Sequence, residues 1–197
     1  MKTKPPRTER KKRTGWYITL FIAGVMVLSI FGIINNPDQA QSYTYQEYTF
    51  TYNQRDFQYD TKINDKTVKF TFLPQDVESL SLQDITQLKD TNSFLMTYDP
   101  TDLYAETLGS IQYLLETELY DHKNIIVQRG LVNATGYSLP EVTCATATPQ
   151  NQVLLFRTAN QTSFTHENFC FIIEGSTQTD LIQYFDRLRY ALYGVIA

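Results

Sequence analysis

The sequence predicts an α+β domain that follows a single N-terminal transmembrane helix, and three patterns indicate this. Residues 16–34 carry no charge and come directly after a strongly basic N-terminus. From residue 43 onward, segments that alternate apolar and polar residues are typical of β-strands. Between and after these segments, apolar residues recur three and four positions apart, which is the spacing of an amphipathic helix. Strand groups separated by helices favour an antiparallel or mixed sheet covered by helices.

The uncharged segment has the length of a membrane-spanning helix. At about 1.5 Å per residue it spans roughly 28 Å, close to the roughly 30 Å hydrocarbon core of a bilayer. Trp16 and Tyr17 stand at its basic end, where aromatic rings favour the headgroup layer, and Ile34 is its last residue. We therefore expect residues 16–34 to be a transmembrane signal anchor, with the lipid bilayer as its partner.

The residues before this segment predict its orientation. The first 13 positions hold seven lysine or arginine residues and one glutamate. The positive-inside rule keeps such a flank in the cytoplasm, so we expect residues 1–15 inside the cell and the chain after Ile34 outside it. The topology determinants closest to the helix are Arg10, Lys11, Lys12 and Arg13.

A cleaved signal peptide is the alternative interpretation of this N-terminus. The apolar region of a signal peptide is usually about 7–15 residues long, which is shorter than the segment seen here. The best cleavage motif ends at Ala40 and has Asp38 where a small residue is preferred. We therefore favour an uncleaved anchor, followed by a short tether at residues 35–42 and an extracytoplasmic domain at residues 43–197.

The charge of the exported part restricts its partners. The chain holds 17 basic and 21 acidic residues, and beyond the first 13 positions 10 basic and 20 acidic residues remain, a net charge of −10. Such an acidic domain repels nucleic acid and anionic lipid headgroups, so no nucleic-acid partner is expected. Plain solubility explains this charge better than a specific role in binding cations.

Two cysteines, Cys144 and Cys170, lie in the part predicted to be exported. An even cysteine count in an oxidising compartment indicates one disulfide, and both residues have apolar, strand-like neighbours. Two free buried thiols are the alternative if the domain faces the cytoplasm. Two cysteines and distant histidines do not have the spacing of zinc ligands, so no metal is expected.

The first part of the exported domain predicts aromatic strands. Aromatic and polar residues alternate over residues 43–52, with a change of phase at residues 46–47 that indicates a bulge or a turn. Residues 56–73 predict a hairpin around a turn signal at residues 64–65. The row of aromatic residues is more typical of a sheet face packed on a core than of a ligand-stacking surface.

A helical region follows the predicted hairpin. Pro74 begins a stretch that predicts one short helix or two, and residues 94–98 predict a short strand. Residues 99–101 then indicate the start of a longer helix, because their side-chain oxygens accept from free amides and Pro100 lacks an amide. This helix has an apolar face over residues 104–119.

The second half of the domain predicts four more strands, at residues 125–132, 140–146, 152–157 and 169–174. Thr177 and Asp180 resemble a capping box, and the amphipathic helix that they introduce extends to Ile196. The last residues of the chain are too apolar for a free tail, so we expect this helix to dock on the sheet.

The sequence predicts no catalytic, cofactor or metal site. The chain has two histidines, His122 and His166, and the sequence shows no convergent partner for either. Glu116 and Glu118 are spaced as paired carboxylates for acid–base work, but with Asp121 they are more typical of a solvated helix end. The nucleophile elbow, the dinucleotide and phosphate loops and the zinc-protease motif are absent from the sequence.

Two N-x-S/T sequons, at Asn133 and Asn160, fall in segments expected to be loops or strand ends. They are candidate glycosylation sites in a host that modifies asparagine outside the membrane.

Several segments of the second half carry a family resemblance: FLMTYDP, IQYLLETEL, NIIVQRGLV, CATATPQNQVLLFR, NFCFIIEG and DRLRYALYGVI. Together with the anchor, they resemble small membrane-anchored proteins of unknown function found in archaea, particularly in the reduced-genome lineages. The best-matching positions are Cys144, Cys170 and the helix end at residues 192–196. The resemblance implies an archaeal envelope protein with a structural disulfide, and it supplies no activity.

Three functions are compatible with these patterns. We expect a single-pass cell-membrane protein, without a cofactor, whose exported domain binds another envelope protein or a surface polymer. A subunit of a larger membrane export or surface-filament assembly is the first alternative, and its helix would pack against other helices. An extracytoplasmic hydrolase is the second, and it requires a cleft in which His122 or His166 meets a carboxylate and a hydroxyl.

Overall fold

The computed structural model describes residues 11–34 and 41–196, and the chain divides into two units at residue 40. The first unit contains helix α1 (Lys11–Ile34), in which Trp16 and Tyr17 are exposed with their rings 5.7 Å apart, edge to face. Among the described residues, no helix combines the length and the apolarity needed to cross a membrane. The transmembrane span and its orientation therefore stay predictions. Outside the described residues lie Arg10, the tether residues 35–40, and the side chains of Lys11, Lys12, Arg13 and Ile34.

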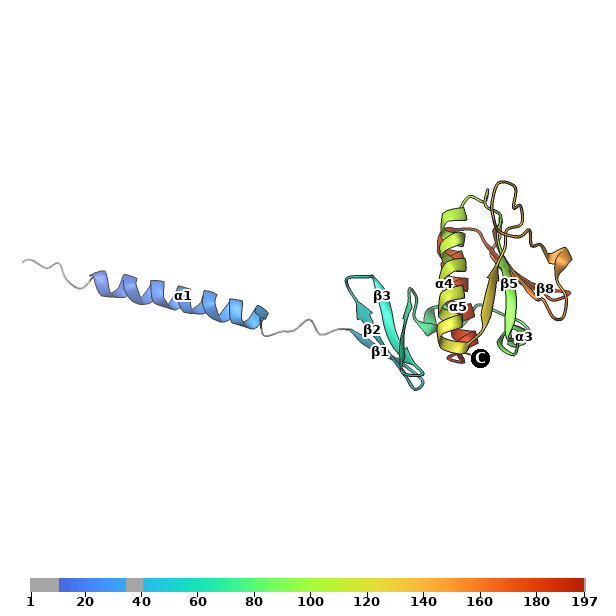
Figure 1. Cartoon of the computed structure of the whole chain (residues 1–197). Helices are drawn as coiled ribbons and strands as arrows, with labels where there is room; N and C mark the ends of the chain where they lie inside the picture. Colours follow the sequence, from blue (N-terminus) through green and yellow to red (C-terminus); the bar gives the residue numbers. More distant parts are fainter. Residues whose placement is uncertain (1–10, 35–40, 197) are drawn as a thin grey trace, which may run out of the picture. The chain divides into compact units, whose positions relative to one another are not determined.

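The second unit begins with a four-stranded antiparallel sheet (Figure 1). Its strands lie side by side in chain order: β1 (Ser42–Tyr45), β2 (Tyr48–Asn53), β3 (Gln58–Ile63) and β4 (Lys66–Phe70). The change of phase at residues 46–47 is the turn between β1 and β2, and the predicted turn at residues 64–65 joins β3 to β4. Asn64 and Asp65 have positive φ values of 50° and 63°, as a type I′ turn requires.

One face of this sheet buries its aromatic side chains. Phe50 and Phe70 are fully buried, and their ring centroids lie 6.0 Å and 4.0 Å from that of Tyr190 in the C-terminal helix. Alternate residues such as Thr44 and Thr49 point to the other face and are exposed. The aromatic row is therefore core, as the alternation predicts.

The domain also contains a five-stranded mixed sheet. Its strand order is β6 (Ile126–Arg129), β5 (Ser93–Thr97), β7 (Val153–Thr158), β9 (Cys170–Gly175) and β8 (Ser163–Glu167). The first four strands are parallel, and β8 pairs with β9 in the antiparallel direction. Residues 153–156 of the central strand β7 are buried on both faces, which is why this run is apolar throughout.

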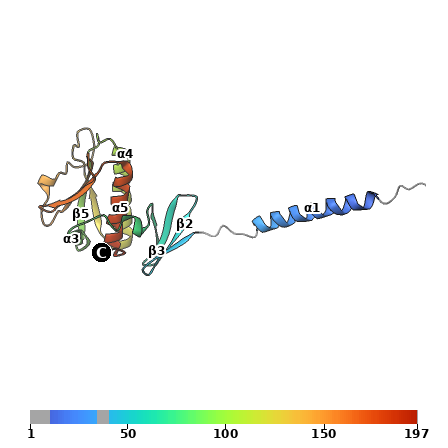
Figure 2. The same ribbon diagram turned by 180° about the vertical axis from the view of Figure 1, so that it is seen from behind.

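Two long helices lie side by side between the sheets (Figure 1 and Figure 2), namely α4 (Ala105–Lys123) and α5 (Gln178–Tyr193). The region after the first sheet forms two short helices, α2 (Pro74–Val77) and α3 (Thr86–Lys89), which is one of the two predicted outcomes. The domain is thus α+β, with an antiparallel sheet and a mixed sheet packed on helices.

Helix α5 begins with the capping box that the sequence predicts. Thr177 Oγ1 accepts from the backbone N–H of Asp180 at 3.2 Å, and Asp180 Oδ2 accepts from the N–H of Thr177 at 2.9 Å. Gly194 ends the helix with a left-handed φ of 80°, a conformation that glycine adopts without steric cost. The three residues together fix the length of α5.

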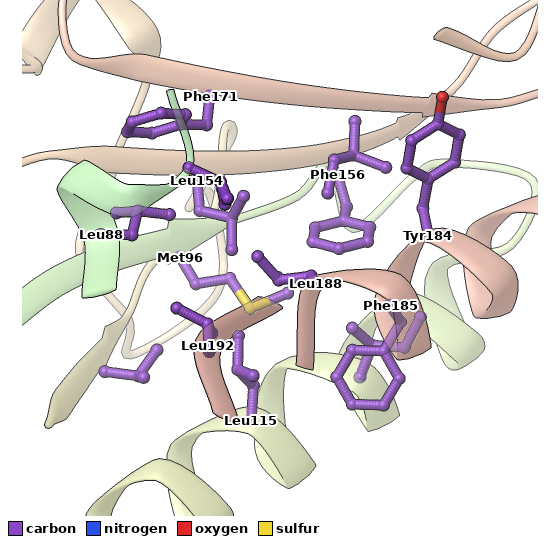
Figure 3. Close-up of a cluster of buried hydrophobic side chains, with 14 of the residues drawn as sticks. Leu88, Met96, Leu115, Leu154, Phe156, Phe171, Tyr184, Phe185, Leu188 and Leu192 are labelled. Atoms are coloured by element: carbon purple, nitrogen blue, oxygen red, sulfur yellow. The ribbon is translucent and has the colours of Figure 1, made fainter. Parts of the chain in front are cut away.

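The main hydrophobic core lies between the helices and the mixed sheet (Figure 3). Helix α5 contributes Leu188 and Leu192, α4 contributes Leu115, and the strands contribute Met96 and Phe156. Each of these side chains is at most 1% exposed, and burial of such a side chain contributes roughly 1.5–3 kcal/mol. Since α5 also packs on the antiparallel sheet, it is buried on two sides.

Helix α4 starts later than the sequence predicts. Residues 99–101 form a turn instead of the cap, and the helix begins at Ala105. The carboxylate of Asp102 holds this start, because it accepts from the N–H of Tyr104 at 2.9 Å and from that of Thr158, at the end of β7, at 2.8 Å. Burial would raise the pKa of Asp102, but a hydrogen bond from the Thr158 hydroxyl and these two backbone bonds outweigh burial and lower it.

The segment at residues 131–148 covers the outer face of the mixed sheet, and here one predicted strand is wrong. Within residues 140–146, Glu141 forms a single isolated bridge with Leu131, and the 3₁₀ turn η1 (Cys144–Thr146) follows. This segment does not join the sheet as a strand, because the inner strands already have partners on both sides. Its apolar residues instead pack on the face of the sheet, where Val142 is buried. Strand β8 was not predicted, because it is a short polar edge strand.

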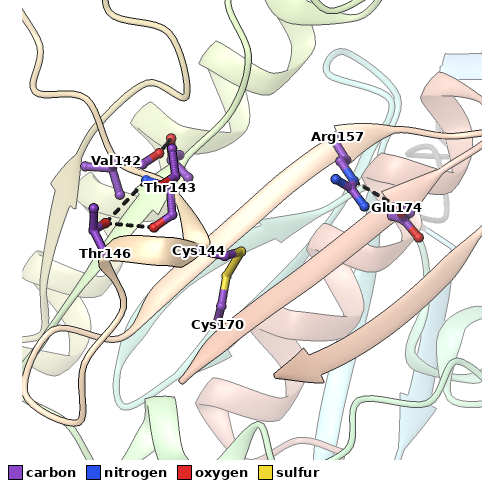
Figure 4. The surroundings of a disulfide bond; sticks show 8 residues. Val142, Thr143, Cys144, Thr146, Arg157, Cys170 and Glu174 are labelled. Atoms are coloured by element: carbon purple, nitrogen blue, oxygen red, sulfur yellow. Dashed lines mark hydrogen bonds and ion pairs between the residues drawn. A yellow bond between two sulfur atoms is a disulfide. The ribbon is translucent and has the colours of Figure 1, made fainter. Parts of the chain in front are cut away.

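Cys144 of η1 and Cys170 of β9 form the predicted disulfide, with their Cα atoms 5.3 Å apart (Figure 4). Cys170 belongs to a small apolar cluster on the outer face, together with Val142 and Val153. The bridge therefore joins the covering segment directly to the strand beneath it.

Replacing both cysteines, as Cys144→Ser with Cys170→Ser, is expected to lower the free energy of unfolding by about 3.5 kcal/mol, because the bridge closes a loop with a sequence separation of 26. Urea denaturation of the purified chain measures this loss. A reducing agent should destabilise the wild type by a similar amount and leave the variant unchanged. Equal stability of the oxidised wild type and the variant would contradict a stabilising role for the bridge.

Candidate functional site

A cleft of about 400 Å³ lies between strand β4 and the helices α4 and α5. Its volume falls within the roughly 300–1,000 Å³ of ligand sites in proteins. The apolar floor of the cleft consists of Ile111, Leu114, Ile182 and Phe185. Hydroxyl groups on its walls come from Thr67, Thr71, Thr107 and Ser110. The titratable and charged groups of the helices that line it are Glu118, His122, Asp186 and Arg189.

Arg189 is the central residue of this charged group. Its side chain is 4% exposed, and its Nε and Nη2 donate to the two carboxylate oxygens of Glu118 at 2.9 Å and 2.6 Å. The guanidinium lies over the rings of Phe70 and Phe185, 4.3 Å and 4.9 Å from their centroids. Burial would lower the pKa of Arg189, but the carboxylates of Glu118 and Asp186 outweigh burial and raise it. Arg189 is therefore a permanent buried cation.

Asp186 lies one helical turn before Arg189 and is 1% exposed. Its Oδ1 accepts from Arg189 Nη1 at 2.9 Å, and its Oδ2 accepts from the backbone N–H groups of Thr71 and Phe72 at 2.7 Å and 2.9 Å. Burial raises the pKa of Asp186 to about 6, while Arg189 and the two amides act in the opposite direction. At neutral pH the carboxylate is therefore ionised, and it ties α5 to the residues that follow β4.

The same pair of side chains occupies part of the open edge of β4. Arg189 Nη2 donates to the backbone carbonyl of Lys69 at 2.6 Å, and Asp186 accepts from the N–H of Thr71. An edge strand leaves a row of backbone groups without a neighbouring strand. Helix α5 therefore supplies side-chain partners where a fifth strand would supply backbone partners.

His122 lies one helical turn after Glu118 on α4, at the same cleft. Its ring stands edge-on to that of Tyr193 at 5.9 Å, and its Nδ1 is buried with no hydrogen-bond partner among the described residues. Burial lowers the pKa of His122, so the ring is neutral at pH 7.

The structure separates the two carboxylates that the sequence places close together. Glu116 pairs with Arg129 of β6 at 2.9 Å, whereas Glu118 binds Arg189 inside the cleft. A solvated helix end, as predicted for these residues, is therefore wrong for Glu118. Since each carboxylate has its own arginine, the two do not form an acid–base pair.

The second histidine does not reach the cleft. His166 lies on β8, with its ring stacked on Phe171 at 4.2 Å and its Nδ1 3.5 Å from Asp84 Oδ2. In the described parts of the chain, neither histidine has a hydroxyl partner of the kind that a hydrolase requires. The described residues also contain no group of three or more His, Cys, Asp or Glu side chains that could hold a metal ion.

Both predicted sequons lie at the surface. Asn133 and Asn160 are exposed, and Asn133 Oδ1 accepts from the N–H of Thr135 at 3.1 Å in a local turn. The hydroxyl of Thr162 in the second sequon donates to Asp180 Oδ2 at 2.7 Å. Glycosylation at either position stays a prediction.

The local sequence patterns do not single out Asp186 and Arg189. Both belong to the segment DRLRY, within a terminal helix that carries apolar residues on more than one face, such as Leu188 and Tyr190. A helix that is apolar on several sides is buried, and charged residues on it must then pair inside the protein. The apolar residues on several faces of this helix therefore indicate that its charged residues are buried and paired.

No family model, no curated protein and no solved structure matches this chain. The resemblance to membrane-anchored archaeal proteins therefore stays a prediction.

Arg189→Met is expected to lower the free energy of unfolding by about 3–5 kcal/mol, because Glu118 and Asp186 would lose their buried partner. Arg157→Met is the matched control: Arg157 pairs with Glu174 at 2.7 Å, but its side chain is 49% exposed, so its loss should cost less than about 1 kcal/mol. Urea denaturation of both variants makes the comparison. Similar small losses in the two variants would show that the buried cluster does not stabilise the domain.

Proposed function

We propose that this chain is a single-pass envelope protein, anchored by residues 16–34, with residues 43–197 outside the cell. The uncharged segment within α1 and the basic residues before it support the anchor and its orientation. The disulfide between Cys144 and Cys170 fits an oxidising compartment, where such bonds persist.

The exported domain acts by binding another envelope protein or a surface polymer, and the β4–α4 cleft is the binding site. One observation supports this proposal: the charged groups that line the cleft already have ionic partners, including Lys69, which pairs with Asp56. Glu118 and Asp186 are both engaged by Arg189. With its carboxylates held in this way, the cleft offers recognition surfaces rather than a free acid or base.

A patch on the other side of α4 favours a second candidate, a subunit of a larger membrane assembly. Tyr113 and Tyr120 of α4 and Ile126 of β6 are each more than half exposed and lie together beside Arg129. Exposed aromatic and aliphatic groups of this kind occur at protein–protein contacts. The two candidates therefore assign the partner to different faces of the same helix.

Protease added to intact cells that express the chain is expected to digest residues 43–197 and to leave residues 1–15 protected. The bilayer shields only the cytoplasmic flank if the anchor is oriented by its basic residues. Immunoblots against a tag at each end of the chain measure the two fates. Survival of the C-terminal tag until the cells are lysed would contradict the proposed topology.

Leu114→Lys is expected to abolish recovery of the envelope partner in a detergent pull-down, because it places an unpaired charge on the apolar floor of the cleft. Tyr113→Lys, at the neighbouring exposed position outside the cleft, is the matched control and should leave recovery unchanged. The reverse result, with loss only in Tyr113→Lys, would place the partner on the outer patch. Retention in both variants would remove the cleft from the proposal.

A further inference from the structure

The backbone of β4 presents an open hydrogen-bonding edge to the cleft. The two-residue turn at residues 64–65 makes its flanking residues, Ile63 and Lys66, a hydrogen-bonded pair. The even-numbered residues of β4 therefore bond to β3. Thr67 and Lys69, at the odd-numbered positions, direct their N–H and C=O groups away from the sheet.

Only part of this edge has partners. Arg189 binds the carbonyl of Lys69, and Asp186 binds the N–H of Thr71, which confirms the direction of the odd-numbered groups. In the part of the chain that the structure describes, no hydrogen bond from outside the sheet reaches the N–H or C=O of Thr67, or the N–H of Lys69. Both residues line the cleft, on the edge of the sheet that these three backbone groups face.

The helices opposite β4 supply an apolar floor to the cleft. Ile111 and Leu114 of α4 and Ile182 and Phe185 of α5 form its floor. A peptide paired with β4 would direct alternate side chains toward this floor, because successive side chains of a strand point to opposite faces. Backbone bonding along one side and apolar contact for alternate side chains is the way in which proteins bind an added strand.

The charged groups that line the cleft are already paired within the protein. Arg189 pairs with Glu118 and Asp186, and Lys69 pairs with Asp56. His122, the remaining titratable group, is neutral at pH 7 because burial lowers its pKa. A site whose charged groups are already paired fits an uncharged segment and offers no free cation to an acidic polymer.

We propose that the cleft binds an uncharged, extended peptide segment of the partner, which adds to the edge of β4 through Thr67 and Lys69 and places an apolar side chain on the floor formed by Ile111 and Leu114. This inference rests on the proposed binding function, and it assigns the partner to the class of proteins rather than surface polymers.

The test selects a random peptide library on the purified full chain in detergent and compares two proline variants. Thr67→Pro removes an N–H that the strand addition uses without removing a bond to β3. Thr44→Pro is the matched control, because Thr44 faces outward in the same way on β1, the opposite edge of the sheet. We expect uncharged peptides with alternate apolar residues, whose affinity falls about tenfold or more in Thr67→Pro and is unchanged in Thr44→Pro.

The outcomes separate the two proposals. Binding that Leu114→Lys abolishes but Thr67→Pro preserves would keep the cleft and overturn strand addition. The same holds if the library yields no peptide while the natural partner is still recovered. If Leu114→Lys leaves recovery of the partner in the pull-down unchanged, the proposed function itself is overturned. If Thr67→Pro does not fold, hydrogen exchange of the wild type decides: the amides of Thr67 and Lys69 should become protected by the peptide, and that of Thr44 should not.

Discussion

The burial of helix α5 on two sides is the constraint on which the rest of the domain depends. One side joins the main core through residues such as Leu188, and the other contacts the aromatic face of the antiparallel sheet through Tyr190. Charged residues on such a helix have no access to water, so Asp186 and Arg189 need partners inside the protein. They find these partners in Glu118 of α4 and in the backbone at the end of β4. The charged cluster thereby fixes where the antiparallel sheet lies against the helix pair.

That position explains why the domain has a cleft. The edge of β4 is held by two side chains instead of another strand, and two side chains reach only part of its length. Where they end, β4 and α4 enclose a space of about 400 Å³. The walls of this space are held by the same buried contacts that stabilise the fold, so a ligand would meet a surface that is already ordered. Such preorganisation lowers the entropic cost of binding.

Features that depend on neighbours in the sequence were predictable, and those that depend on distant contacts were not. The turn at residues 64–65, the capping box at Thr177 and the alternation of the aromatic strands are local, and the structure contains all three. The strand expected at residues 140–146 fails because its apolar residues pack on a sheet whose inner strands are already paired. The pairing of Arg189 with Glu118 joins residues 71 positions apart, and no local pattern specifies it.

The disulfide also imposes an order on the biogenesis of this domain. Cys144 belongs to the segment that covers the outer face of the mixed sheet, but its partner Cys170 lies on β9, the last strand to be synthesised. Because synthesis begins at the N-terminus, this segment emerges well before the residue that will hold it. In the folded domain, Val142 and Val153 share one apolar cluster with Cys170. The covalent loop can therefore close only after all the strands of the domain have been synthesised.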